Sequence, residues 1–246
     1  MINLLRQIVK NICKYIGFDV RVYDFRTIHK LRKIKLIHDL RINVIIDGGA
    51  NVGQFAQRIF SEGYSGRMIS VEPLPECFAI LKNNMIGRKG WTGIKCGLGD
   101  LNCQKTLNVS SDTQSSSILT ATGVASTESF IGCREELISI RRLDEILTTQ
   151  TSPDDKIYLK LDVQGYEDKV LNGLGEWLDK IAIIEIEAST IELYRGEALF
   201  HNLASRLANN YSLYSLDEVL VDYRTGRLLQ IEMLFVNNAY LKNSKM

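Results

Sequence analysis

The segment from residue 44 to residue 55 limits the fold of this chain more than any other feature. It reads VIIDGGANVGQF, which is an apolar run, a glycine-rich turn and the start of an amphipathic pattern. The run predicts a buried strand, and the glycines let the following turn pass close to a ligand. Because the first N–H groups of a helix have no partner inside it, this strand–turn–helix order is typical of ligand-binding loops in α/β proteins.

Short apolar runs alternate with helical patterns along the rest of the chain. The expected strands are residues 43–47, 67–72, 92–97, 157–162, 181–187, 211–216 and 228–236. The expected helices are residues 54–62, 76–85, 167–174 and 197–209. The pair Thr225-Gly226 predicts a turn that joins the last two strands as an antiparallel hairpin. This alternation predicts an α/β fold with a mostly parallel sheet.

Charge and composition divide the chain into parts. Residues 1–41 hold ten Lys or Arg and three Asp, so they carry +7, and the remainder carries −6 because the whole chain is +1. We expect residues 1–41 to form a basic helical extension and residues 42–246 to form the main domain. Residues 101–150 are rich in Ser and Thr, with few helical stretches before residues 142–147, which predicts an insertion over the sheet edge that carries a substrate loop. Within it, residues 110–127 are expected to line the substrate site, with a disordered solvent loop as the alternative.

The basic extension begins with an apolar stripe. Its members recur at helical spacing and are Ile2, Leu5, Ile8, Val9, Ile12 and Ile16. Arg6, Lys10 and Lys14 flank the stripe, so residues 1–17 could contact the body, a second copy of the chain or an anionic membrane surface. The sequence favours packing or a homodimer over a peripheral membrane contact, because the stripe is short and lacks Trp or Phe before Phe18.

Several classes of partner and location are excluded or favoured by composition. A net charge of +1 gives no bulk field for nucleic acid, so no nucleic-acid partner is expected. Five cysteines without a C-x-x-C pair favour reduced thiols and a cytoplasmic location, and no apolar stretch is long enough for a membrane span. His29, His38 and His201 stand alone, so no metal site is expected.

The acidic residue at the end of the first strand indicates which ligand the glycine-rich turn holds. Asp47 would repel the pyrophosphate of a dinucleotide, but it would attract the positively charged sulfonium and amino groups of S-adenosylmethionine. The spacing D-x-G-x-N-x-G fits that ligand better than G-x-G-x-x-G does. We therefore expect Asp47, Gly49, Asn51 and Gly53 to surround the methionine half of this cofactor.

Two further strand ends carry acidic residues that suit the rest of the cofactor. Glu72 lies nineteen residues after Gly53, where a carboxylate can accept hydrogen bonds from both ribose hydroxyls. Asp100 follows the third strand and is placed to accept a hydrogen bond from the adenine amino group. Since parallel strands end at one edge of a sheet, these residues are expected to face one crevice.

The fourth and fifth strands supply candidate catalytic residues. Asp162 ends the fourth strand, where a carboxylate could act as a general base or align a hydroxyl. Lys160 shares its face, either as part of the catalytic group or as a structural ion-pair partner. Glu185 and Glu187 alternate along the fifth strand, and burying two carboxylates there is costly unless they are paired or used. At least one of them is expected to face the pocket.

The motifs together resemble those of the FkbM family of S-adenosylmethionine-dependent methyltransferases. They are Asp47-Gly48-Gly49-Ala50-Asn51-Val52-Gly53, Glu72-Pro73, Gly99-Asp100 and Lys160-Leu161-Asp162-Val163-Gln164-Gly165-Tyr166-Glu167. The resemblance implies a class I, Rossmann-like methyltransferase fold, with seven strands of which the last is antiparallel and with helices on both faces. It also implies O-methylation of a hydroxyl on a saccharide, a glycan or a related natural product. Gln164 stands where many relatives have Glu, which removes one candidate base.

Two other functions remain open from the sequence. A methyltransferase-like scaffold would keep the fold and the cofactor site without transferring a methyl group, although intact Asp47, Glu72 and Asp162 argue against it. A nucleotide-dependent oxidoreductase is less favoured, because Asp47 opposes a pyrophosphate. Nucleic-acid amino methylation lacks its Pro-Pro-aromatic clamp, since the turn after the fourth strand reads Asp162-Val163-Gln164-Gly165.

Overall fold

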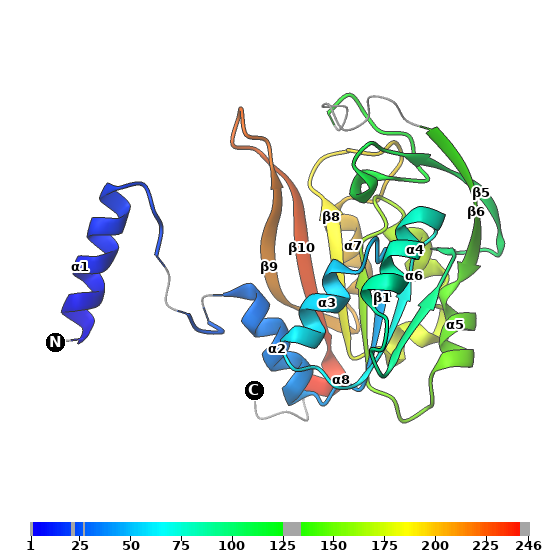
Figure 1. Ribbon diagram of the computed structural model, residues 1–246, viewed down its shortest axis with the longest axis horizontal. Helices are drawn as coiled ribbons and strands as arrows, with labels where there is room; N and C mark the ends of the chain where they lie inside the picture. The colour runs from blue at the N-terminus through cyan, green and yellow to red at the C-terminus, as the bar shows by residue number, and fades with distance from the viewer. Residues whose placement is uncertain (1, 21–22, 27, 125–133, 242–246) are drawn as a thin grey trace.

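A seven-stranded sheet with the order β3-β2-β1-β7-β8-β10-β9 forms the centre of the molecule (Figure 1). The computed structural model describes residues 2–20, 23–26, 28–124 and 134–241. The strands of this sheet are β1 (Val44–Gly48), β2 (Arg67–Val71), β3 (Trp91–Ile94), β7 (Ile157–Leu161), β8 (Ile183–Ser189), β9 (Tyr211–Val221) and β10 (Leu228–Asn237). β10 is antiparallel to both neighbours, and the other pairs are parallel. The expected mostly parallel sheet with an antiparallel last strand is confirmed.

Helices cover both faces of this sheet because its central strands are apolar on both sides. Every residue of β1 and β7 is buried. Ile45 faces a cluster built with α2 (His29–Asp39), α3 (Gln54–Ser61) and α4 (Pro75–Asn84). Val44 and Ile46 face a second cluster. That cluster is built with α5 (Leu143–Gln150), α6 (Glu167–Asn172), the 3-10 helix Gly175–Lys180 and α7 (Phe200–Leu207).

The Ser/Thr-rich interval forms a second sheet instead of a long loop. β4 (Gly97–Gly99), β6 (Arg134–Arg142) and β5 (Cys103–Val109) make a three-stranded sheet in the order β4-β6-β5. Leu107 and Ile138 of this sheet pack on Leu74 at the start of α4. One expectation changes, because residues 97–99 leave the main sheet. The interval ends as α5, whose apolar residues belong to the main core.

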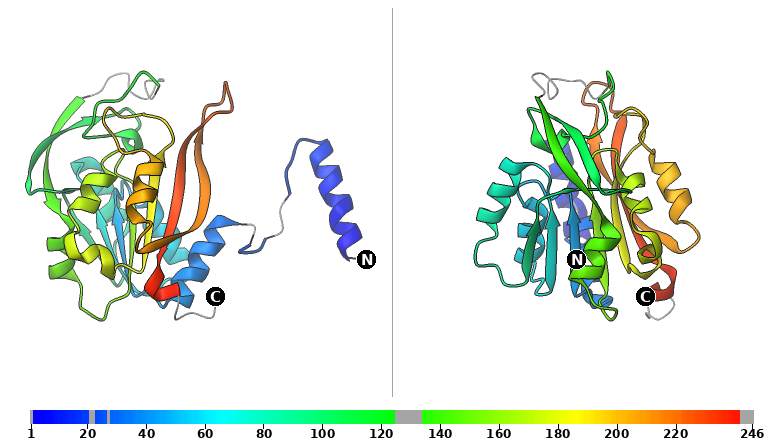
Figure 2. Two further views of the ribbon diagram at one scale, coloured as in Figure 1. Left: turned by 180° about the vertical axis from the view of Figure 1, so that it is seen from behind. Right: turned by 90° about the vertical axis from the view of Figure 1, so that its right-hand side faces the viewer.

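The first 41 residues, expected to act as one extension, do not form one unit. α1 (Ile2–Tyr15) stands apart from the α/β body, whereas α2 packs against it (Figure 2). Leu36 of α2 is fully buried, and Lys33 is 4% exposed. The body therefore includes α2, and only the residues before it extend away. Among the described residues, no helix has the length and apolar character needed to cross a membrane.

The glycine-rich turn after β1 is held in a conformation and a space that suit only glycine. Gly49 has φ +75°, and a Cβ atom on it would lie 1.8 Å from the main-chain oxygen of Asp162. Gly63 also has a positive φ, +94°, but a Cβ atom there would meet nothing within 4 Å. The close approach of the turns after β1 and β7 therefore depends on the missing side chain at position 49.

Replacing Gly49 by Ala is expected to destabilise the protein far more than replacing Gly63 by Ala. Gly63→Ala should cost about 1–2 kcal/mol, which is the usual penalty for a left-handed backbone at a non-glycine residue. Gly49→Ala adds a collision with main chain and should cost more than about 4 kcal/mol, a loss typical of a forced change in packing. Urea unfolding of both variants measures the difference, and equal losses would show that the two turns are not packed as described.

Candidate functional site

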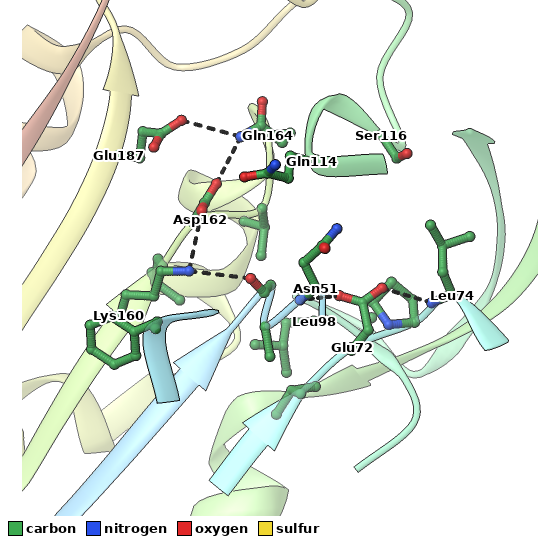
Figure 3. Close-up of a pocket in the computed structure, with 18 of the residues that line it drawn as sticks. Asn51, Glu72, Leu74, Leu98, Gln114, Ser116, Lys160, Asp162, Gln164 and Glu187 are labelled. Carbon is green, nitrogen blue, oxygen red and sulfur yellow. Dashed lines mark hydrogen bonds and ion pairs between the residues drawn. The ribbon is translucent and has the colours of Figure 1, made fainter. Parts of the chain in front are cut away.

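A cavity of about 270 Å³ opens at the carboxyl ends of the central strands (Figure 3). It lies where the strand order reverses at β1, which is the usual position of ligand sites in open α/β sheets. Seven residues expected to be functional line it: Gly49, Asn51, Glu72, Lys160, Asp162, Glu185 and Glu187. The strand ends therefore bring most of the predicted residues together.

Glu72 joins the turns that follow β1 and β2. Its Oε2 accepts a hydrogen bond from the N–H of Asn51 at 2.8 Å, and its Oε1 accepts one from the N–H of Leu74 at 2.9 Å. Asn51 itself has φ +47°. Burial raises the pKa of Glu72 to about 7, against the opposing effect of these N–H donors. The carboxylate thus lies on the cavity wall with a charge that changes near neutral pH.

Lys160 ties the ends of β1 and β7 together. Its Nζ lies 3.4 Å from Asp47 Oδ1 and 3.2 Å from Asp162 Oδ2, and it donates a hydrogen bond to the main-chain oxygen of Gly49 at 3.2 Å. The ammonium group also lies 5.6 Å from the centre of the Phe55 ring. Burial lowers the pKa of Lys160, but the charges of Asp162 and Asp47 outweigh burial and raise it. Lys160 therefore remains protonated.

Gln164 links two carboxylates at the acidic end of the cavity (Figure 3). Its Nε2 donates hydrogen bonds to Asp162 Oδ1 at 2.7 Å and to Glu187 Oε1 at 3.2 Å. The hydroxyl of Tyr194 donates to Gln164 Oε1 at 2.6 Å, which fixes the side-chain amide. A neutral donor between two acids reduces their repulsion, which a Glu at this position would increase. Gln at position 164, in place of the Glu that the family resemblance implied, therefore allows Asp162 and Glu187 to lie close together.

Glu187 has the altered proton affinity expected of a group that exchanges protons near neutral pH. Burial and the nearby charge of Asp162 raise the pKa of Glu187 to about 8. Asp162 is more accessible, with 29% of its side chain exposed. The two carboxylates thus differ in burial and in their partners, although they share one amide donor. Such a difference suits separate roles in positioning a substrate and accepting its proton.

Glu185 belongs to a different charged cluster, which the sequence did not reveal. Lys33 of α2 lies 2.9 Å from Glu185 and 2.7 Å from Glu232, and both Lys33 and Glu185 are buried. His29 Nδ1 lies 3.0 Å from Glu232, and the hydroxyl of Tyr158 donates to Glu185. Burial raises the pKa of Glu185 to about 7, although Lys33 opposes this. Glu185 touches the cavity but is paired with α2.

Three residues expected to contact the cofactor do not line the cavity. Asp47 is fully buried, receives a hydrogen bond from Ser70 at 3.4 Å and supports Lys160 from below. Gly53 precedes α3 as its N-terminal cap, with φ +91°. Asp100 lies 3.4 Å from Lys169 on α6. These three residues lie outside the cavity lining, because strand ends fix only main-chain positions and ion pairs redirect the two carboxylates.

The apolar end of the cavity lies between the main sheet and the second sheet. The apolar side chains there are those of Leu74, Cys96, Leu98, Leu107, Ile118 and Ile138. Gly97 and Leu98, which lie shortly before Asp100 in the sequence, line this end, although Asp100 itself does not. The cavity thus has an apolar end and an acidic end.

The segment 110–124 covers the cavity and is hydrogen-bonded to its surroundings. Thr113, Gln114 and Ser116 line the cavity, and Asn51 Nδ2 donates to Thr113 Oγ1 at 3.1 Å. Isolated β-bridges pair Asn108 with Ser117 and Ala121 with Tyr194. Residues 125–127, also expected to contact the acceptor, lie outside the described residues. In the part of the chain that the structure describes, no three His, Cys, Asp or Glu side chains gather as a metal site would require.

Replacing Lys33 by Met should destabilise the protein in a pH-dependent way. Glu185 would then be buried without its cation, which costs about 3–5 kcal/mol when one partner of a buried ion pair is removed. The loss of unfolding free energy should be large at pH 8 and smaller at pH 5, because Glu185, whose pKa is raised to about 7, takes up a proton as the pH falls. Lys35→Met on the same helix, whose Lys lies beside Asp39 at the surface, is the control and should change stability far less. A pH-independent loss in Lys33→Met would contradict this.

Comparison with known proteins identifies the family. The sequence model described as the methyltransferase FkbM domain matches residues 47–214, which is more than half of the chain. No curated protein is similar enough in sequence to count as a match. Solved structures are similar to this chain at low sequence identity, as three examples illustrate.

The first is the methyltransferase FkbM of Methylobacillus flagellatus KT, with 16% identity and a TM-score of 0.49 over 78% of this chain. The chain spans 43% of that protein's length. Magnesium protoporphyrin IX methyltransferase of Synechocystis PCC 6803 has 8% identity, covering 85% of this chain and 77% of that one, with a TM-score of 0.47. TrmK of M. capricolum, bound to S-adenosylhomocysteine, has 10% identity, covering 83% and 68%, with a TM-score of 0.45. By the family match, the chain belongs to the FkbM family of S-adenosylmethionine-dependent methyltransferases.

Proposed function

We propose that this protein transfers the methyl group of S-adenosylmethionine to a hydroxyl oxygen of a saccharide, a glycan or a related natural product. One observation carries the proposal: Asp162 and Glu187 are held side by side on one amide, at the acidic end of the cavity. Two carboxylates with different environments suit a hydroxyl that must be both oriented and deprotonated. The Ser/Thr-rich segment above them adds hydroxyl and amide groups that suit a polyol.

The residues that line the cavity suit the three parts of the cofactor. Its apolar end, next to Leu98, suits the adenine ring, and Glu72 between the two ends suits the ribose hydroxyls. The turn at Gly49 leaves main chain exposed to the methionine half, and the acidic end is favourable for a sulfonium. In this assignment Asp47 acts indirectly, because it holds Lys160 and thereby the turn.

The rate of methyl transfer then depends mainly on how the acceptor oxygen is positioned. When bound, the cofactor supplies an activated methyl group on a positively charged sulfur. Asp162, held by Lys160 and Gln164, accepts a hydrogen bond from a neighbouring hydroxyl of the acceptor and so orients the reacting hydroxyl, whose own hydrogen points to Glu187. Glu187, whose raised pKa makes it a good proton acceptor near neutral pH, takes the hydroxyl proton as the new bond forms. Such general base assistance contributes about 10²–10⁴-fold in rate.

Glu72→Gln should weaken cofactor binding and remove its pH dependence. Losing charge-assisted bonds to two ribose hydroxyls should cost about 1.5–3 kcal/mol of binding free energy. In the native protein the affinity should rise between pH 6 and pH 8, because the pKa of Glu72 is raised to about 7 and only its ionised form accepts both bonds. Calorimetric titration measures both effects. Glu76→Gln, next to the site but outside the cavity lining, is the matched control and should bind the cofactor with native affinity. If Glu72→Gln also bound the cofactor with native affinity, Glu72 would not hold the ribose.

Incubation with methyl-labelled S-adenosylmethionine and a panel of saccharides tests the reaction itself. We expect a mass gain of one methyl group on a hydroxyl, at a rate that rises as the pH passes 8 and Glu187 ionises. Below pH 8, where Glu187 is mostly protonated, Glu187→Gln should bind the cofactor with native affinity. Above pH 8 it should transfer at least about 10²-fold more slowly and lose this rise. Methylation of amines only would contradict the proposal and favour another class of acceptor. Cofactor binding with no transfer to any acceptor would contradict it and favour a methyltransferase-like scaffold.

A further inference from the structure

An exposed apolar face lies on α1. Leu5, Ile8, Val9 and Ile12 are spaced three or four residues apart on this helix, so they share one side of it. Their exposed fractions are 63%, 46%, 43% and 58%. Figure 1 and the left view of Figure 2 place α1 away from the α/β body. The body of the same chain therefore does not cover this face, contrary to one of the two uses that the sequence favoured.

The charges of α1 are all of one sign. Arg6, Lys10 and Lys14 lie four residues apart and form a ridge beside the apolar face, and residues 2–17 contain no Asp or Glu. Like charges at this spacing repel one another in an isolated helix. An external anionic surface would relieve that repulsion along the whole ridge at once.

We propose that α1 lies flat on a membrane surface that contains anionic lipids. The apolar face would enter the boundary of the acyl chains, and the basic ridge would lie among the lipid head groups. Tyr15 and Phe18, which are 93% and 66% exposed, follow the stripe and supply the aromatic rings that prefer this interface. The contact is peripheral, because α1 has 14 residues and is too short to span a bilayer.

Charge favours a lipid surface over a second copy of α1. Two α1 helices packed through their apolar faces would bring two basic ridges together, with no acid in either helix to offset them. The lipid surface needs no such compensation, since its own charge is negative. The proposal does not depend on which acceptor the catalytic site uses.

Cosedimentation of the full chain with vesicles tests the proposal. Vesicles of phosphatidylcholine with about 30 mol% phosphatidylglycerol should bind the protein, and vesicles of phosphatidylcholine alone should bind it far less. The triple variant Arg6→Gln/Lys10→Gln/Lys14→Gln should lower the partition coefficient for anionic vesicles about a hundredfold. Ile8→Asn/Ile12→Asn should abolish binding, because the apolar anchor is lost.

A matched control removes three charges from the body. Lys82→Gln/Lys89→Gln/Lys95→Gln, at exposed positions outside the cavity lining, should bind vesicles as the native protein does. Equal binding to both kinds of vesicle, or an equal loss in the control variant, would overturn the proposal. A dimer in sedimentation velocity that Ile8→Asn/Ile12→Asn dissociates, together with no vesicle binding, would assign the face to a second copy instead.

Discussion

The ammonium group of Lys160 is the contact on which the arrangement of the site depends. It lies between the carboxylates of Asp47 and Asp162 and reaches the main chain of Gly49, so it connects the ends of β1 and β7 where the sheet order reverses. A buried cation of this kind is stable only while its partners are present. The cavity floor is therefore fixed by electrostatics as well as by packing.

Around this contact, the protein buries more acid than a structural core requires. Glu72, Glu185 and Glu187 all have a pKa raised by burial to between about 7 and 8, and each touches the cavity. Every one of them has a donor within the protein, which limits the cost of burial. Acids whose pKa lies near neutral pH can hold hydroxyl groups and exchange protons, which is the chemistry that the proposed methyl transfer to oxygen needs.

Much of this arrangement could be predicted from the sequence, because it follows from local patterns. The glycine turn after β1 and the acids at strand ends have fixed spacing, so seven candidate residues meet at one cavity. Side-chain direction could not be predicted, and ion pairs with Lys160 and Lys169 turn Asp47 and Asp100 away. The role of α2 was also hidden, since Lys33 meets Glu185 across 152 positions of sequence. The second sheet escaped notice because its strands lack long apolar runs: β5 reads CQKTLNV and β6 reads REELISIRR, with polar or charged residues at most positions.

A crystal structure of the protein with S-adenosylhomocysteine would test the central claim most directly. The account predicts adenine against Leu98, both ribose hydroxyls within hydrogen-bond distance of Glu72, and the sulfur facing the side chains of Asp162 and Glu187. It also predicts Gln164 still between those two carboxylates. A cofactor product bound elsewhere, or bound with its sulfur turned away from Asp162 and Glu187, would contradict it.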